Sequence, residues 1–444
     1  MSPNIVIISG EISGDLVGGA LAAEIAKRRP DLKMWGIGST NMAEAGVELL
    51  YDSSQWSAIG IIEALRIYPL LKFQALPRML RELEARKPSL IILIDFGAFN
   101  IRIATKKPQG TPVLYYFPPG SWKQHGSLNP QIAQVTDRIA TQFPWSAERL
   151  KSIGANVTFV GHPLLDIVKP SLDRKVFAER FGLDPLKPII GLLPGSRGHE
   201  IVHNTPAMLG SASILMEHLG DAQFVFGVAS PQAREMIETA IETRMEDHRE
   251  KLALKRVAED AIEKGQHLLA DHQPKMLTPE GILLDPSSQS RSPRFAPTVP
   301  KNRSTENLPP IVLVENMTYD VMAHSNALQI CSGTATLEAA ILGTPMSILY
   351  RGSKIMALEA KLRRIIPANI GMPNIIADRR IVPEFIQDAA TPEALAAETL
   401  RQLTDLDYRS EMRRQLLEVR GVLASPSPEG ATSMTANIAL ELCK

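Results

Sequence analysis

The sequence predicts two α/β domains, each built on a parallel sheet, that face one another across a cleft. Its 444 residues exceed what one ordinary hydrophobic core holds, and the 44% that are apolar suffice for two cores. Short continuous apolar runs alternate with segments of helical period, which is typical of buried parallel strands joined by crossover helices. The alternation begins again in the second half of the chain, which indicates a second sheet.

The apolar runs give the expected strands. The first series occupies residues 5–8, 34–37, 90–94, 113–116 and 157–160, and the second occupies residues 189–193, 223–226, 311–314, 327–330 and 346–350. We therefore expect an N-terminal domain over residues 1–168 and a C-terminal domain over residues 169–391. The helical segments of residues 392–444 are long enough to run back across the first domain.

Residues 246–310 interrupt the second series. The segment begins with a charged run and continues into a stretch rich in Ser and Pro, so its second half is expected to be a disordered surface insertion. Residues 286–310 contain four basic residues and one acidic residue. A weak contact of this part with an anionic surface therefore stays open, although a solvated loop is the preferred reading. No catalytic role is assigned to it.

The composition excludes several classes of protein. Lys plus Arg and Asp plus Glu both number 48, so no global field attracts nucleic acid. Cys331 and Cys443 are far apart and have no Cys or His at ligand spacing, which argues against a disulfide framework or zinc site and favours a reducing cytoplasm. No secretory signal and no window of ~18 uncharged apolar residues occurs. A peripheral membrane role stays open.

One amphipathic stretch, residues 59–90, favours such a role. An apolar face is bordered by positive charge, as in a helix that lies on anionic lipid. A surface helix docked on its own core explains the same pattern, and the two coexist if only the tip is exposed. The apolar residues are Ile61, Ile62, Leu65, Ile67, Leu70 and Leu71, and the basic ones are Arg66, Lys72, Arg78 and Arg81.

Two strand-to-helix junctions in the second half are suited to phosphate. Each ends an apolar strand in small residues, and the free N–H groups at the start of the following helix favour an anion. A guanidinium in one junction can hold phosphate oxygens, and a carboxylate in the other can reach a ribose. A nucleotide-sugar diphosphate is therefore expected in this half. The residues are Gly195, Ser196 and Arg197 in the first junction, and Ser332, Gly333, Thr334 and Glu338 in the second.

Asp95 is the candidate general base. It follows the buried run 91–94, at the carboxyl edge of the first sheet, where ligands of open α/β folds collect. A base there can take the proton of an acceptor hydroxyl that attacks a sugar carbon. The alternative is a strand-end Asp that accepts hydrogen bonds from loop amides. Asn100 can orient Asp95 or the acceptor.

Further candidates follow the other strands of the first domain. Glu11, Gly14 and Asp15 lie in a Gly-containing loop that opens a helix, and Asp15 can simply cap that helix. Trp122 follows a strand that ends in aromatic residues, which suits a sugar platform, an acyl chain or ordinary packing. His162 can donate to phosphate, or it can be structural beside its proline.

Taken together, these motifs resemble the lipid-A-disaccharide synthases, inverting glycosyltransferases with two Rossmann-like domains in the GT-B architecture. The resemblance covers nearly the whole length, and the order and spacing of the motifs make it specific. The matching stretches are residues 9–15, Ile94-Asp95 with Phe99-Asn100, residues 159–163, residues 193–197 with Glu200, Ser332-Gly333-Thr334 with Leu337-Glu338, and residues 372–376.

The resemblance implies transfer of 2,3-diacylglucosamine from its UDP conjugate to the 6-hydroxyl of 2,3-diacylglucosamine 1-phosphate, at the cytoplasmic face of the membrane. It makes Asp95 the base and Glu338 the ligand of the ribose. It also adds Glu315, Asn316 and Met317 to the donor pocket and places Asn374 beside the cleft. No metal or other cofactor is implied, and the oligomeric state is left open.

Two departures separate the chain from that family pattern. Residues 117–124 keep one Trp of a run that the family usually has, with changed surroundings, so the acceptor is less defined than the donor class. The insertion is the second departure. A UDP-sugar epimerase, another GT-B transferase and a non-catalytic lipid- or nucleotide-binding relative therefore remain as alternatives, although Asp95, Arg197 and Glu338 argue against the last.

Overall fold

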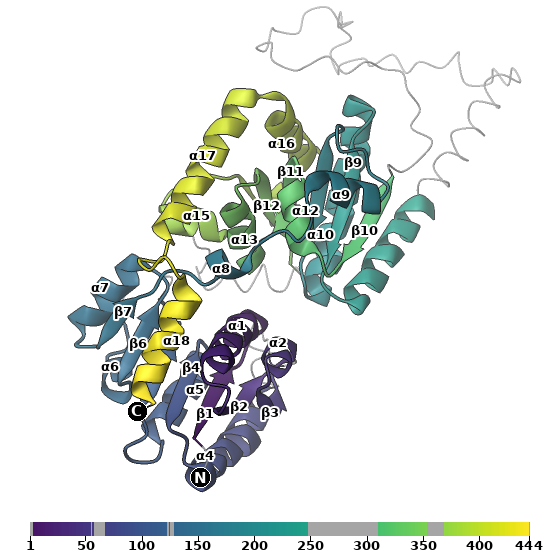
Figure 1. Ribbon diagram of the computed structural model, residues 1–444. Helices are drawn as coiled ribbons and strands as arrows, with labels where there is room; N and C mark the ends of the chain where they lie inside the picture. The colour runs from purple at the N-terminus through teal and green to yellow at the C-terminus, as the bar shows by residue number, and fades with distance from the viewer. Residues whose placement is uncertain are drawn as a thin grey trace, which may run out of the picture.

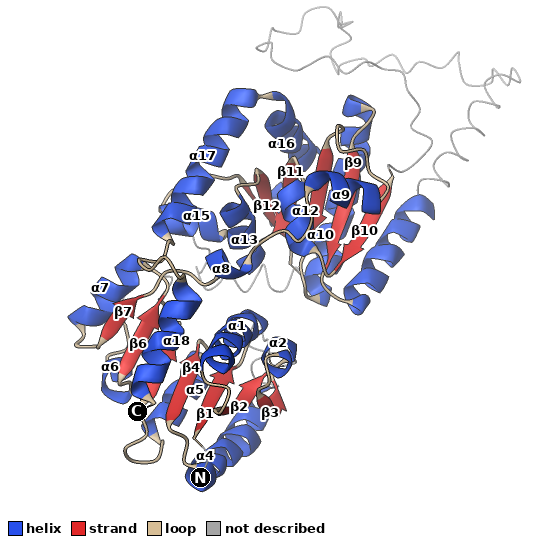
Figure 2. Ribbon diagram, in the orientation of Figure 1, coloured by secondary structure: helices blue, strands red, loops and turns tan. Residues whose placement is uncertain are grey.

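Two parallel sheets, each covered by helices on both faces, form the protein (Figures 1 and 2). The computed structural model describes residues 3–54, 56, 67–121, 124, 128–246, 310–352 and 368–443. The expected fold class is confirmed. The insertion predicted at 246–310 lies almost wholly outside the described residues.

The first sheet has the strand order β3-β2-β1-β4-β5-β6-β7, and every pairing in it is parallel. The expected runs at 90–94 and 113–116 coincide with β4 and β5. Strands β3 and β6 were not expected, because Glu48, Asp52 and Arg138 interrupt what would otherwise be apolar runs. The bounds are β1 Asn4–Ser9, β2 Lys33–Gly38, β3 Glu48–Asp52, β4 Leu90–Ile94, β5 Val113–Tyr116, β6 Arg138–Thr141 and β7 Val157–Phe159.

The second sheet has the order β10-β9-β8-β11-β12-β13 and is also parallel. All five expected runs are strands, and the additional one, β13, is too short at three residues to give a periodic signal. The bounds are β8 Ile189–Leu193, β9 Gln223–Val228, β10 Ile311–Glu315, β11 Ala327–Cys331, β12 Met346–Tyr350 and β13 Glu384–Ile386.

Helices connect successive strands. Those of the first domain are α1 Ile12–Arg28, α2 Thr40–Glu44, α4 Leu76–Arg86, α5 Gly97–Thr105, α6 Gln131–Val135, α7 Pro144–Ser152 and α8 Leu164–Ile167. Those that follow are α9 Arg174–Arg180, α10 Gly198–Leu219, α12 Thr318–His324, α13 Thr334–Leu342, α15 Met372–Ala377, α16 Pro392–Thr404, α17 Leu406–Val422 and α18 Ala431–Leu442.

The C-terminal helices divide between the domains. Met412 and Leu416 of α17 are buried in the core of the second domain, whereas Ala436 and Ala439 of α18 are buried in the core of the first (Figure 1). The crossing back to the first domain is held by backbone hydrogen bonding, because the N–H of His162 donates to the carbonyl of Leu423 over 2.9 Å. The chain therefore passes between the domains twice.

The described part of the amphipathic stretch both docks and protrudes. Met79 and Leu83 of α4 are fully buried, as a docked helix requires. A π-helical turn over Leu71–Ala75 precedes α4, and there Phe73 is 67% exposed, with the ammonium of Lys72 about 5.2 Å from its ring centre. The first half of the predicted interfacial helix, up to residue 66, lies outside the described residues.

Candidate active site

The candidate residues lie at the two points where the strand order changes direction. In the first sheet, β2 and β3 lie on one side of β1, and β4 and the strands after it lie on the other. In the second sheet, β9 and β10 lie on one side of β8, and β11 and the strands after it lie on the other. Ligands of open α/β sheets bind outside the carboxyl ends of strands at such points. Asp95 follows β4, and Arg197 and Glu338 follow β8 and β11.

Asp95 is held in a strained backbone conformation. Its φ is 45° and that of Phe96 is 48°, a left-handed region that residues other than Gly adopt rarely. The carbonyl of Asp95 accepts from Tyr115 Oη at 2.7 Å and from Asn100 Nδ2 at 2.9 Å, which fastens the turn. A Cβ on Gly10 would meet the Phe96 ring at about 2.2 Å, so glycine is required there. Strain of this kind is characteristic of functional sites.

The carboxylate of Asp95 is poorly compensated. Burial is the main cause that raises the pKa of Asp95 to about 6, and the negative charge of Glu11 adds to it. A hydrogen bond from the backbone N–H of Phe96 is the effect that opposes them. A strand-end Asp that serves to bind loop amides would have its pKa lowered instead. Asp95 therefore differs from a strand-end Asp whose carboxylate is satisfied by several loop amides.

Asn100 supports Asp95 through its backbone. The side chain is fully buried, and its Nδ2 donates to the carbonyls of Ile94 and Asp95. This is the orienting role that the sequence suggested, exerted on the main chain of Asp95. The Oδ1 of Asn100 has no hydrogen-bond partner within the described part of the chain.

Asp15 has a structural position. Its Oδ1 accepts from the N–H groups of Ser39 and Met42, and its Oδ2 accepts from the N–H and the Nδ2 of Asn41, at 2.6–3.2 Å. It therefore caps α2, not the helix α1 on which it lies. Gly14 also serves packing, because a Cβ there would approach Ser9 Oγ at about 2.4 Å. Glu11, by contrast, is exposed at the start of α1.

In the second domain, Glu200 organises the turn after β8. Its Oε2 accepts from the N–H groups of Ser196 and Arg197, and its Oε1 accepts from Arg197 Nη1 at 3.0 Å. A Cβ on Gly195, whose φ is 125°, would meet Glu200 Oε2 at about 2.5 Å. The amides of Ser196 and Arg197 are thus occupied, so the guanidinium is the group of this turn that an anion can reach. Glu200 is the third residue of α10 and accepts from the N-cap amide of Arg197, which is the half of a capping box that a carboxylate supplies.

The turn after β11 combines exposed backbone at a helix start with a partly buried carboxylate. Gly333 and Thr334 are exposed at the start of α13, and the hydroxyl of Ser332 donates to the carbonyl of Ile370. Burial raises the pKa of Glu338 to about 7. The hydroxyl of Tyr319 donates a long hydrogen bond of 3.5 Å to its Oε1. A carboxylate held this loosely can accept hydrogen bonds from a ligand.

Glu315 is the last residue of β10, at the edge of the second sheet, and Asn316 and Met317 follow it. Glu315 forms an ion pair with Arg234 over 2.9 Å, and Asn316 has a φ of 57°. The side chain of Glu315 is therefore engaged by its own domain.

Asn374 and His162 are enclosed by the fold. Both Nδ2 hydrogens of Asn374 are donated, to the carbonyl of Val382 and to Glu384, and its Oδ1 accepts from the N–H groups of Ile381 and Val382. Asn374 is fully buried and thus shapes the loop beside β13 without offering an atom to a ligand. Burial lowers the pKa of His162 to about 3, and its Nδ1 accepts from the N–H of Leu164. Neutral His162 fits the structural alternative.

Trp122 lies outside the described residues, but its neighbour Gln124 is informative. Gln124 Nε2 donates to the carbonyls of Ile375 and Ile376 in α15 at 3.1 and 3.0 Å. The loop after β5 therefore reaches the second domain, which brings the carboxyl edges of the two sheets towards one another. Within the described residues, no group of three or more His, Cys, Asp or Glu side chains is placed to hold a metal ion.

Comparison with known proteins agrees with this arrangement. The sequence model of the family described as lipid-A-disaccharide synthetase matches residues 5–269 and 286–428. Lipid-A-disaccharide synthase of Geobacter metallireducens is 34% identical, over 99% of this chain and 98% of its own length, and that of Syntrophotalea carbinolica is 32% identical, over 99% and 95%.

Solved structures share the fold at low identity. A putative UDP-N-acetylglucosamine 2-epimerase from Listeria monocytogenes superposes with a TM-score of 0.56 at 11% identity, over 99% of this chain and 96% of its own. The UDP-GlcNAc 2-epimerase from Neisseria meningitidis has a TM-score of 0.53 at 12% identity, over 99% and 100%. With the family model matching almost the entire length, the chain belongs to the lipid-A-disaccharide synthetase family of glycosyltransferases.

Proposed function

We propose that the protein transfers 2,3-diacylglucosamine from UDP-2,3-diacylglucosamine to the 6-hydroxyl of 2,3-diacylglucosamine 1-phosphate, with Asp95 as the general base. The observation that carries the proposal is the uncompensated carboxylate of Asp95 at the change of strand direction in the first sheet. A pKa of about 6 leaves it ionised near neutral pH, and its basicity is higher than that of an ordinary carboxylate.

The step conserves atoms and charge. The acceptor oxygen attacks C1 of the donor sugar, its proton passes to Asp95, and the bond from C1 to the diphosphate oxygen breaks with its electron pair on UDP. Attack opposite the leaving group gives the β-linked disaccharide. Arg197 and the amides at the start of α13 stabilise the charge that grows on the diphosphate, which lowers the barrier because the charge is greater in the transition state. The proposal requires no metal or other cofactor.

Glu338 fits the ribose of the donor. Its carboxylate is partly buried near the start of α13 and has a raised pKa, so ribose hydroxyls that donate to it would supply hydrogen bonds that the fold does not provide. The backbone amides at the same helix start would then face the diphosphate. Helix α13 would therefore contact both the ribose and the diphosphate of the donor.

Attachment to the cytoplasmic face of the membrane is part of the proposal. The exposed rings of Tyr68 and Phe73, with the ammonium of Lys72 beside both, combine apolar surface with positive charge. That combination suits anionic lipid. No helix among the described residues is long and apolar enough to cross a membrane.

Mass spectrometry of the products tests the proposal directly. The purified chain is incubated with UDP-2,3-diacylglucosamine, alone and together with the acylated sugar phosphate. We expect a disaccharide monophosphate and UDP only when both substrates are present. Conversion of the sugar nucleotide without an acceptor would show an epimerase, and no conversion in either mixture would reject the transferase reaction for this chain. Asp95→Ala is expected to abolish turnover and to keep the affinity for UDP within a few fold.

A further inference from the structure

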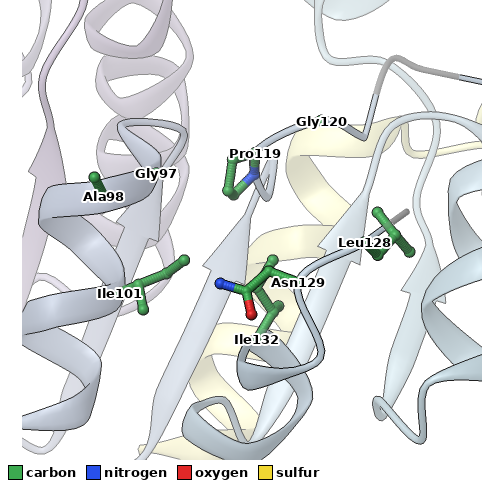
Figure 3. Close-up of a pocket in the computed structure, with 8 residues that line it drawn as sticks. All are labelled: Gly97, Ala98, Ile101, Pro119, Gly120, Leu128, Asn129 and Ile132. Carbon is green, nitrogen blue, oxygen red and sulfur yellow. The ribbon is translucent and has the colours of Figure 1, made fainter. Parts of the chain in front are cut away.

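A groove opens beside the catalytic turn of the first domain (Figure 3). Its volume is about 400 Å³, within the range of roughly 300–1,000 Å³ that small-molecule sites occupy. One wall is the first turns of α5, the other is α6 with the residues before it, and the loop after β5 closes the top. The lining residues are Gly97, Ala98, Ile101, Pro119, Gly120, Leu128, Asn129 and Ile132.

The lining is apolar. Asn129 supplies its polar side chain, and the Oδ1 of Asn129 already accepts from the N–H of Gln131 at 3.0 Å. Ile101 and Leu128 turn their inner sides to the core and their outer sides to the groove. A sugar or a phosphate would lose its hydration here without new hydrogen bonds, whereas a hydrocarbon chain would gain from leaving water.

Two glycines set the path of the backbone that borders the groove. A Cβ on Gly97 would meet Pro119 at about 2.8 Å, so glycine lets the loop after β5 close against α5. Gly120 has a φ of 75°, and a Cβ there would have no neighbour within 4 Å, so this side of the loop borders empty space. The groove is therefore formed by the backbone path and is not a gap between mobile side chains.

The groove begins at the base. Gly97 is the second residue after Asp95, and the strand β5 that leads to Pro119 pairs with β4. We propose that this groove binds an acyl chain of the acceptor, with the acceptor sugar at Asp95 and the chain running along α5 towards Ile132. The inference rests on the proposed function, and it adds the place where the lipid part of the substrate is recognised.

The acceptor is favoured over the donor by the position of the groove. The nucleotide part of the donor is assigned to the second domain, at Arg197 and Glu338, whereas every residue of the groove belongs to the first domain. The hydroxyl that loses its proton to Asp95 is on the acceptor. An acyl chain attached to that sugar has the shorter path into the groove.

The test uses Ala98→Trp, which fills the groove from the first turn of α5. Ala98 is exposed, so the larger side chain does not disturb the core. The matched control is Ala23→Trp, the same change at an exposed alanine of α1 that lies outside the lining. A second variant, Leu128→Gln, makes the opposite wall polar. Unchanged UDP affinity and an unchanged unfolding midpoint verify that each variant is folded.

Each protein receives two acceptors in one reaction, glucosamine 1-phosphate carrying acetyl groups and the same sugar carrying dodecanoyl groups, with UDP-2,3-diacylglucosamine as donor. The ratio of the two products cancels changes in overall rate, and comparison with Ala23→Trp cancels the partitioning of the lipid into micelles. Burial of one methylene is worth about fourfold in affinity, so the loss of several such contacts is measurable.

We expect the wild type and Ala23→Trp to prefer the dodecanoyl acceptor, and Ala98→Trp and Leu128→Gln to lower that preference by roughly tenfold or more. A preference that is the same in all four proteins would overturn the groove assignment and leave the transferase reaction intact. Failure of the wild type to make either disaccharide would instead reject the proposed function. The two failures are therefore distinguishable.

Discussion

The pH dependence of folding stability offers a direct test of the role given to Asp95. A carboxyl with a pKa of 3.8 in the unfolded chain and about 6 in the folded protein binds its proton more tightly when folded. It therefore favours folding below its unfolded pKa, and this contribution is lost as the pH rises through about 6. Above that pH, the folded protein carries a buried charge that is poorly compensated.

The perturbation is Asp95→Asn, which removes the charge and keeps the shape. The difference between 3.8 and about 6 corresponds to about 3 kcal/mol at 1.36 kcal/mol per pKa unit, and we reduce it to about 2 kcal/mol because solvent still reaches part of the side chain. At about pH 8 the variant should be more stable than the wild type by this amount, and most of the electrostatic gain should be lost at about pH 4, close to the unfolded pKa. Asn also tolerates a φ of 45° well, which adds a gain that does not depend on pH.

The assay is urea unfolding of the wild type and the variant at both pH values, with the change in the difference between them as the readout. Asp15→Asn is the matched control, since that carboxylate accepts four hydrogen bonds and its replacement should destabilise the protein at about pH 8. An Asp95→Asn variant that is less stable than the wild type at about pH 8, or whose gain is the same at both pH values, would refute the view that the Asp95 carboxylate is uncompensated.

Three other predictions concern the ligand sites. Arg197→Ala should weaken UDP binding by about tenfold or more in calorimetry, as for a lost charge-assisted hydrogen bond, and an equal loss in Asp95→Ala would contradict the assigned roles. The UDP affinity of the wild type should fall as the pH drops below about 7, because ribose hydroxyls donate to the ionised form of Glu338. Glu338→Gln should make the affinity less dependent on pH. A wild-type affinity that does not change with pH would count against a ribose contact. Phe73→Ser should reduce sedimentation with vesicles that contain anionic lipid, and binding that neither this change nor added salt weakens would exclude the surface around Lys72 as the point of attachment.

The strands of both sheets were predictable where burial on both faces leaves a continuous apolar run. The runs at 90–94, 113–116 and 189–193 are strands with those bounds. The short strands β3, β6 and β13 were not found, because edge or near-edge strands of three to five residues carry charged residues and are specified by pairing with a neighbour that is distant in sequence.

The positions of the candidate site residues were predictable as far as the ends of the strands were. Asp95, Arg197 and Glu338 each follow an apolar run, and the parallel topology brings such positions to one edge of a sheet. The hydrogen-bond partners of a side chain cannot be predicted from its position at the end of a strand. Asp15 has the same sequence context as a ligand-binding loop, but Ser39, Asn41 and Met42, which use its oxygens, lie 24 or more residues further on. Asn374 likewise depends on the loop that precedes β13.

Hydrogen bonding separates the carboxylates that are satisfied within the fold from those that we propose to contact a ligand. Asp15 and Glu200 are buried and accept four and three hydrogen bonds from neighbouring groups, so a ligand that approached them would have to break existing bonds. Asp95 and Glu338 are shielded from water and accept few hydrogen bonds from the fold, and the pKa of each is raised. A fold retains such groups at a cost in stability, and that cost is recovered when a substrate hydroxyl supplies the missing hydrogen bond. One of these two carboxylates lies in each domain, which is consistent with the proposal that the first domain binds the acceptor and the second binds the donor.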